Sequence, residues 1–123
     1  MEYTDTILIV DDSQMITKVL SFIVKKAGYH VLTAGDGKNA LELLDGRAVD
    51  LVITDLHMPV MDGNQLICEI RKREHYRYLP VVLFNTDIEK NGKEILRTSG
   101  ATMLFDKKNI KEKIISTIQK MLG

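Results

Sequence analysis

The sequence has little of several features that mark particular classes of protein. It contains one cysteine, Cys68, so no disulfide can form within the chain and a reducing compartment fits best. Its 17 lysines and arginines balance 17 aspartates and glutamates, which argues against a nucleic-acid-binding domain. No apolar run approaches the roughly 18 residues of a membrane span, and the acidic residues 1–5 lack a signal peptide's basic region. These absences predict a cytoplasmic protein.

What remains is the composition and size of one globular domain. The chain has 123 residues, of which 45% are hydrophobic and 28% charged. No linker or low-complexity tail follows the last predicted helix, so we expect a single domain over residues 1–123. Cys68 lies in an apolar helical stretch with Leu66, Ile67 and Ile70, which favours a packing role over a catalytic one.

Short apolar runs alternate with longer amphipathic segments along the chain. The apolar runs predict five strands, at residues 7–10, 30–34, 50–54, 81–84 and 101–105. Apolar residues at helical spacing predict five helices, at residues 14–27, 37–44, 63–74, 88–98 and 110–122. The helix at 88–98 is the weakest, since Asn91-Gly92 interrupts its pattern.

This alternation predicts an α/β fold built from five strand–helix units. Continuous apolar strands joined by helical crossovers indicate a parallel sheet with helices on both faces. Right-handed crossovers restrict such a sheet to a few doubly wound strand orders. Because ligands in these sheets bind beyond the carboxyl ends of the strands, the functional residues should follow the strands directly.

Acidic residues follow three of the predicted strands. Asp11-Asp12-Ser13 come after the first, Asp55 after the third and Asp106-Lys107-Lys108 after the fifth. Each group alone has an ordinary explanation, because aspartate and serine cap helices and strands often end in aspartate. Together they are harder to explain, since two carboxylates about 4 Å apart repel by about 4 kcal/mol at an effective dielectric of about 20. Such an edge needs a cation, or must keep one carboxyl group protonated.

Oxygen ligands of this kind suit Mg²⁺ or Mn²⁺, which retain waters and also bind phosphate oxygens. His57 is the only histidine nearby, so a transition-metal site rich in nitrogen fits less well. A carboxylate can also act as a nucleophile and form an aspartyl phosphate. A metal ion, a lysine and backbone N–H groups would then neutralise the charge of the phosphoryl group. The set therefore points to phosphoryl transfer.

These residues resemble the receiver domain of bacterial and archaeal response regulators, and the resemblance covers nearly the whole chain. Asp11-Asp12 resembles the family's acidic pair, and Gly100-Ala101 followed by Lys107 resembles its fifth-strand signature. The segment DLHMPVMDG at residues 55–63 resembles its phosphoacceptor motif and is highly specific. The resemblance, which extends to single-domain chemotaxis regulators, implies a flavodoxin-like sheet of five parallel strands in the order 2-1-3-4-5.

Carried over by position, the resemblance implies that Asp55 accepts the phosphoryl group and that Lys107 pairs with it. Mg²⁺ would be bound by Asp11, Asp12, Asp55 and the backbone carbonyl of His57. The donor would be a phosphohistidine on a histidine kinase or phosphotransfer protein. The domain would catalyse only its own phosphorylation and dephosphorylation, so it would not be an enzyme acting on other substrates.

The fourth strand departs from the family's pattern at the position where its conformational switch begins. That strand usually ends in Thr or Ser, but here the position is Asn85, and Thr86 follows it. Because side chains alternate along a strand, Asn85 should face the phosphoryl group, where its NH₂ can donate a hydrogen bond. Thr86 could contribute its backbone N–H, or its side chain through a bulge or an early turn.

The fifth strand departs from the pattern as well. Leu104 takes the place of the family's Tyr or Phe, and Phe105 should enter the core on the opposite face. Lys108 replaces the proline that commonly follows the lysine, and a cis Lys107–Lys108 bond would lie about 3 kcal/mol above trans. We therefore expect retained phosphorylation chemistry and an atypical output switch.

Two stretches of the chain are basic. Residues 71–73 are flanked by Glu69 and Glu74, which favours a solvated helix face. The C-terminal segment carries Lys107, Lys108, Lys111, Lys113 and Lys120. Spacing alone explains these as a charged outer face. In the family, however, the face formed by the fourth helix, fifth strand and fifth helix commonly meets downstream protein targets.

Three other interpretations compete with this one. A flavodoxin-like cofactor binder would need a Ser/Thr/Gly-rich phosphate loop where this chain has acids, and a haloacid-dehalogenase-type phosphatase would need D-x-D and a cap insertion. The third is a receiver-fold interaction module that signals without phosphorylation, favoured by Asn85 and Leu104 and opposed by the intact acids and Lys107. The chain could be a shuttle or phosphorelay intermediate, or a domain excised from a longer protein. We expect it to be a monomer or a weak dimer.

Overall fold

The computed structural model describes residues 5–86 and 88–123, with the backbone alone for residues 88–91. The strands are β1 (Thr6–Val10), β2 (His30–Ala34), β3 (Leu51–Asp55), β4 (Val81–Asn85) and β5 (Met103–Asp106). The helices are α1 (Gln14–Lys26), α2 (Gly37–Leu43), α3 (Gly63–Lys72), α4 (Ile88–Ser99) and α5 (Ile110–Leu122). Short 3₁₀ helices, η1 (Glu74–Tyr76) and η2 (Lys107–Asn109), follow α3 and β5. Every predicted element is present.

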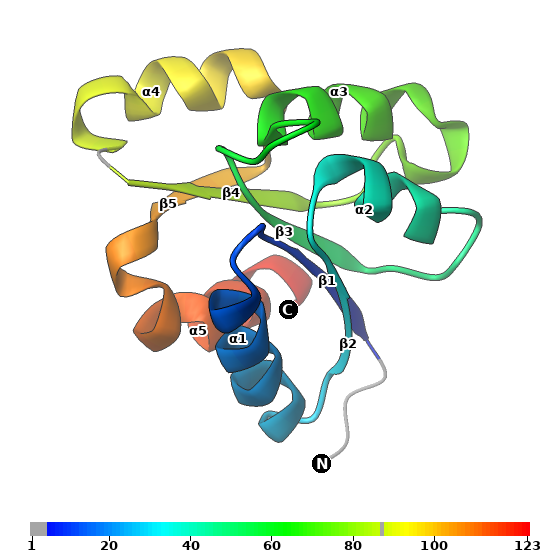
Figure 1. Cartoon of the computed structure of the whole chain (residues 1–123), viewed down its shortest axis with the longest axis vertical. Coiled ribbons are helices and arrows are strands. Elements are labelled where there is room, and N and C mark those ends of the chain that lie inside the picture. Colours follow the sequence, from blue (N-terminus) through cyan, green and yellow to red (C-terminus); the bar gives the residue numbers. More distant parts are fainter. Residues whose placement is uncertain (1–4, 87) are drawn as a thin grey trace.

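The five strands form one parallel sheet in the order β2-β1-β3-β4-β5. This order confirms the flavodoxin-like, doubly wound fold. Helices α1 and α5 cover one face of the sheet, and α2, α3 and α4 cover the other (Figure 1). The chain moves outward from β1 to β2 and then returns to β3, so the strand order reverses between β1 and β3. Ligand sites in such sheets form beyond the strand ends at this reversal.

Alternate residues of the central strands enter two separate hydrophobic cores. Leu8 and Val10 of β1 pack in the core beneath α2 and α3. Ile7 and Ile9 of the same strand pack in the core beneath α1 and α5. Since both faces of β1 are covered, its sequence shows no polar alternation, which is the pattern expected of a buried parallel strand.

Side-chain caps begin helices α1, α2 and α3, which start at the carboxyl edge of the sheet. Ser13 Oγ accepts a hydrogen bond of 3.3 Å from the Ile16 N–H at the start of α1. Asp62 and Gln65 form a reciprocal capping box at the start of α3. Caps of this kind stabilise a helix by about 1 kcal/mol. Because Ser13 caps α1, the carboxylates of Asp11 and Asp12 are not needed for that purpose.

Two expectations for the helices were wrong. Cys68 is exposed rather than packed, because α3 buries Leu66, Ile67 and Ile70 on one face and position 68 falls outside that face. The helix predicted to be interrupted at Asn91-Gly92 is continuous from Ile88 to Ser99. A single glycine inside a helix costs only about 1 kcal/mol relative to alanine, which tertiary packing can offset.

The prediction that residues 71–73 form a solvated face holds for Lys72 and Arg73, which are exposed, but not for Arg71, which is half-buried. The Arg71 guanidinium donates hydrogen bonds to the carbonyls of Arg77, Leu79 and Gly100, at 3.1, 2.6 and 3.2 Å. Arg73 donates to the carbonyls of Leu41 and Leu44. The two side chains thus tie α3 to the loops beside it.

The acidic residues at the start of the chain, 1–4, lie outside the described residues, so the prediction made from them stays a prediction. Across residues 5–86 and 88–123, the structure has no helix that is long and apolar enough to cross a membrane.

Candidate functional site

The carboxyl ends of β1, β3 and β5 bring together the charged residues that the sequence singles out. Asp11 directly follows β1, Asp55 is the last residue of β3 and Lys107 directly follows β5. Asp11 and Asp55 are buried, with 1% and 5% of their surface exposed, while Asp12 is exposed. Residues separated by up to 96 positions in sequence are thus neighbours at one edge of the sheet.

Lys107 lies between the two buried carboxylates. Its ammonium donates a hydrogen bond of 2.8 Å to Asp55 Oδ2 and lies 3.2 Å from Asp11 Oδ2. The same Nζ lies 5.5 Å from the centroid of the Phe84 ring, which belongs to the core beneath α1 and α5. Burial lowers the pKa of Lys107, but the hydrogen bond and charge of Asp55 and the charge of Asp11 outweigh it. The net result is a raised pKa, so this lysine stays protonated.

The two carboxylate oxygens of Asp11 differ in the hydrogen bonds that they accept. Asp11 Oδ1 accepts a hydrogen bond of 2.9 Å from the Ser13 N–H. Asp11 Oδ2 is buried and accepts no hydrogen bond from any described residue; its contact with Lys107 has an ion-pair distance only. The Lys107 charge compensates this oxygen only in part, and an ion or a water could supply a further partner.

The acidic side chains of this edge fit a divalent cation. Asp11, Asp12 and Asp55 each offer one carboxylate oxygen, and these atoms lie within 4.8 Å of one another. Three carboxylates against one lysine leave a net negative charge at the edge. An all-oxygen donor set that is partly open to solvent suits Mg²⁺, which keeps several of its waters. The position of the His57 carbonyl as a further ligand stays a prediction, and the His57 side chain is exposed.

The ionisation of Asp11 should make the metal-free protein less stable as the pH rises. Burial raises the pKa of Asp11 above its ordinary 3.8, and the charge of Asp55 adds to this, although the Ser13 N–H and Lys107 oppose it. The folded state therefore holds this proton at pH values where the unfolded chain has lost it. The contribution of Asp11 to stability is full below pH 3.8 and is lost as pH rises through the folded pKa.

Urea denaturation in a chelator, with wild type and Asp11→Asn compared between about pH 4 and about pH 7, measures this contribution. We expect the free energy of unfolding of wild type, relative to the variant, to fall as pH rises. A difference that stays constant, or that grows with pH, would contradict the assigned burial effect.

The loop after β3 returns closely to the strand end that carries Asp55. The Gly63 N–H donates a hydrogen bond of 2.7 Å to the Leu56 carbonyl. A Cβ at Gly63 would lie 2.6 Å from the Asp55 carbonyl oxygen and 2.8 Å from Leu83 Cδ1. Only glycine therefore lets α3 begin this close to Asp55. Val60, also in this loop, has φ of 70°, a conformation that is strained for a β-branched residue.

Gly63→Ala should destabilise the protein by about 1–3 kcal/mol, since the added methyl group meets backbone atoms that cannot move independently. Gly35→Ala is the matched control, because no atom lies within 4 Å of a Cβ at Gly35. Urea denaturation measures both. Equal unfolding free energies for the two variants would show that the loop adjusts freely.

Of the residues of the expected switch, Asn85, Leu104 and Phe105 lie on strands, whereas Thr86 directly follows β4. Asn85 ends β4, is buried, and pairs in register with Asp106 of β5, whereas Thr86 is exposed. Leu104 packs against the core beneath α3. Phe105 lies in the opposite core, with its ring 5.8 Å from that of Phe84. The opposite placement of Leu104 and Phe105 is confirmed, while the roles of Asn85 and Thr86 stay predictions.

The turn after β5 contains a feature that the sequence analysis missed. Asp106 accepts a hydrogen bond of 2.9 Å from the Lys108 N–H and caps the 3₁₀ helix η2. The described part of the chain contains no cis peptide bond, so the chain turns here without one. The Asp-x-Lys spacing is a capping signal that could have indicated this turn. The contact of Lys107 with the Phe84 ring was also missed, because strand register is needed to find it.

The sequence profile described as the response regulator receiver domain matches residues 7–119 of this chain. The chain belongs to this family. Members are receivers of two-component signalling: they interact with histidine kinases or phosphotransfer proteins and bind Mg²⁺ at an acidic pocket. Receiver domains are not ordinary enzymes.

Similar proteins include both large sensors and single-domain regulators. The CAI-1 autoinducer sensor kinase/phosphatase CqsS of Vibrio cholerae is 33% identical over 95 residues, which are 76% of this chain and 14% of CqsS. The polar-differentiation response regulator DivK of Brucella ovis is 25% identical over 120 residues, 98% of both chains. The structure of the chemotaxis response regulator CheY4 of Vibrio cholerae matches with a TM-score of 0.90 and 32% identity, over 98% of this chain and all of CheY4.

These relatives differ in how much of their length the chain represents. It spans 14 to 28% of three curated relatives, CqsS among them, but nearly all of DivK and CheY4.

Proposed function

We propose that this receiver domain accepts a phosphoryl group on Asp55 from a phosphohistidine donor in a Mg²⁺-dependent reaction. The observation that carries the proposal is the position of Lys107, whose ammonium bonds Asp55 Oδ2 beside a buried Asp11 oxygen that accepts no hydrogen bond from the described residues. The lysine and a cation would together hold a nucleophilic carboxylate and three phosphoryl oxygens. The whole chain, 1–123, would form this one domain.

In the proposed transfer, a carboxylate oxygen of Asp55 attacks the phosphorus of the phosphohistidine. A new O–P bond forms as the N–P bond breaks, and the histidine nitrogen leaves with the bonding electrons. Lys107 neutralises negative charge on the phosphoryl oxygens. When bound by Asp11, Asp12, Asp55 and the His57 carbonyl, Mg²⁺ supplies the remaining positive charge. Water later releases phosphate by attacking the same phosphorus, so the domain catalyses both of its own reactions.

We also propose that the response to phosphorylation differs from the usual one. Asn85 stands where a hydroxyl side chain is usual, and its amide is longer and carries two donor hydrogens. Thr86 would add a backbone N–H to the phosphoryl group. Leu104 has no hydroxyl or ring to reorient, so the motion passed to α4, β5 and α5 should be altered. A downstream protein target would bind this face of a monomer or weak dimer.

The lifetime of the phosphorylated state, compared between wild type and Asn85→Thr, tests the role of Asn85. Equal lifetimes would contradict such a role.

Incubation with acetyl phosphate and Mg²⁺, followed by intact mass measurement, tests the transfer. Wild type should gain one phosphoryl group, and Asp55→Asn should gain none because an amide cannot form the acyl phosphate. Asp106→Asn, which alters the neighbouring strand end, should behave as wild type. If wild type gains no phosphoryl group and titration detects no Mg²⁺ binding, the chain is instead a receiver-fold interaction module that signals without phosphorylation.

A further inference from the structure

Strand β2 forms an open edge of the sheet. In the described sheet it pairs only with β1, through the register Thr6–His30 to Val10–Ala34. The outer side of an edge strand carries unpaired backbone N–H and C=O groups, which are a template for another strand. His30 and Thr33 on this strand are exposed.

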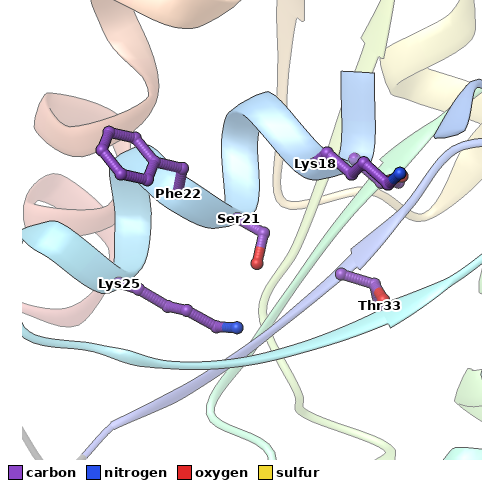
Figure 2. Close-up of a pocket in the computed structure, with 6 residues that line it drawn as sticks. Lys18, Ser21, Phe22, Lys25 and Thr33 are labelled. Carbon is purple, nitrogen blue, oxygen red and sulfur yellow. The ribbon is translucent and has the colours of Figure 1, made fainter. Parts of the chain in front are cut away.

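Two hollows lie along this edge and share one lysine. The first, of about 330 Å³, lies between α1 and β2 and is lined by Lys18, Ser21, Phe22, Lys25 and Thr33, with Thr17 (Figure 2). The second, of about 520 Å³, includes Lys25 again, together with His30 and Arg47. Lys25 borders both hollows and residues of β2 line both, so we refer to the pair together as the groove beside β2.

The groove is basic. Among the described residues no acidic side chain lines either hollow. Helix α1 carries Lys18, Lys25 and Lys26 and has no aspartate or glutamate along its 13 residues. Arg47 is paired with Asp45 at 3.3 Å, but no described residue forms a hydrogen bond or ion pair with the side chains of Lys18, Lys25, Ser21 or Thr33. Four donor groups therefore face the groove without protein partners.

We propose that this groove binds an extended acidic segment of a partner protein, which adds to the sheet as a sixth strand beside β2. Backbone hydrogen bonds to the edge would give affinity, and Lys18 and Lys25 would select acidic side chains on the face towards α1. The site is separate from the acidic edge that holds Asp55.

The spacing of the charges favours an extended chain over a small anion. Lys18 and Lys25 are seven residues apart, about 10 Å along a helix. His30 and Thr33 are about 10 Å apart along the strand. A single phosphate cannot meet donors spread over this length, whereas an extended segment with acids two to four residues apart can. A second copy of this chain is disfavoured, because two such edges would bring lysines together.

Capped octapeptides that alternate glutamate with valine or threonine are the probes for this proposal. Backbone NMR titration should show saturable shifts of the amides of residues 30–34. Lys18→Glu with Lys25→Glu should weaken binding about tenfold or more, since two ion pairs become two repulsions. Lys18→Gln with Lys25→Gln is the milder version, should the first variant not fold. Lys38→Glu with Lys111→Glu makes the same charge change elsewhere on exposed positions and should bind as wild type.

Two further peptides test whether binding needs acidic side chains and whether it needs backbone hydrogen bonds. A peptide with lysine in place of glutamate should not bind, and one with proline at alternate positions should bind more weakly because it lacks backbone donors. Failure of every acidic peptide to shift the β2 amides would overturn the proposal. So would equal weakening by the two charge-reversal pairs, or binding of pyrophosphate at the same amides as tightly as the acidic peptide.

Discussion

Replacement of Lys107 by methionine is expected to slow phosphoryl transfer to Asp55 by about 100-fold. The loss follows from charge, because removal of one preorganised donor to a developing anion reduces rates by about 10²–10³. Lys107 donates at 2.8 Å to Asp55 Oδ2 and lies 3.2 Å from Asp11 Oδ2, so the change also leaves two buried carboxylates without their cation. The raised pKa of Lys107 means that the wild-type ammonium is charged throughout the neutral range.

Lys108→Met is the matched control for this experiment. Its side chain is exposed, and its Nζ lies 4.0 Å from Asp106, outside the cluster. Initial rates with acetyl phosphate at saturating Mg²⁺, followed by intact mass, compare the two variants with wild type. Similar rates for Lys107→Met and Lys108→Met would show that Lys107 has no part in the transfer.

Asp12→Asn should have opposite effects on the metal-free and the metal-bound protein. Without metal, it removes one of three carboxylates whose oxygens lie within 4.8 Å, and so relieves repulsion. Full Coulomb repulsion at that distance is about 3 kcal/mol at an effective dielectric of about 20. Because Asp12 is exposed and solvent screens its charge, we expect the free energy of unfolding to rise by only about 1 kcal/mol. With metal, the same change removes a ligand and should weaken Mg²⁺ binding at least tenfold.

Urea denaturation in chelator and in excess Mg²⁺ measures both effects. Mg²⁺ should stabilise wild type, because a ligand that binds only the folded state raises the free energy of unfolding. It should stabilise Asp12→Asn far less at the same concentration. Asp45→Asn, an exposed acid paired with Arg47, should respond to Mg²⁺ as wild type does. If Asp12→Asn were less stable in chelator and equally stabilised by Mg²⁺, the acidic edge would not be a metal site.

Much of the fold could be predicted because the sheet is buried on both faces. Apolar runs such as Leu8–Val10 have no other stable location, and helical crossovers then force the strands to be parallel. That topology places every strand end at one edge, so Asp11, Asp55 and Lys107 could be expected together from their positions after the strands. Local spacing and topology are sufficient for such features.

Features that depend on register or on helix phase could not be predicted as well. Cys68 was expected in the core because its neighbours are apolar, but a helix turns about 100° per residue and carries it outward. The carbonyls that Arg71 bonds belong to three different loop positions, which no local pattern reveals. The contact of Lys107 with Phe84 likewise requires the pairing of β4 with β5.

The central claim is that Asp55 is the residue that carries the phosphoryl group. Reduction of the phosphorylated protein with borohydride converts an aspartyl phosphate to homoserine, and fragmentation of the peptide that contains residues 55–63 locates the change. The account predicts homoserine at position 55 alone, only when Mg²⁺ and a phosphoryl donor are both present. Homoserine at Asp11, Asp12 or Asp106, or none at position 55 in protein that has gained a phosphoryl group, would contradict it.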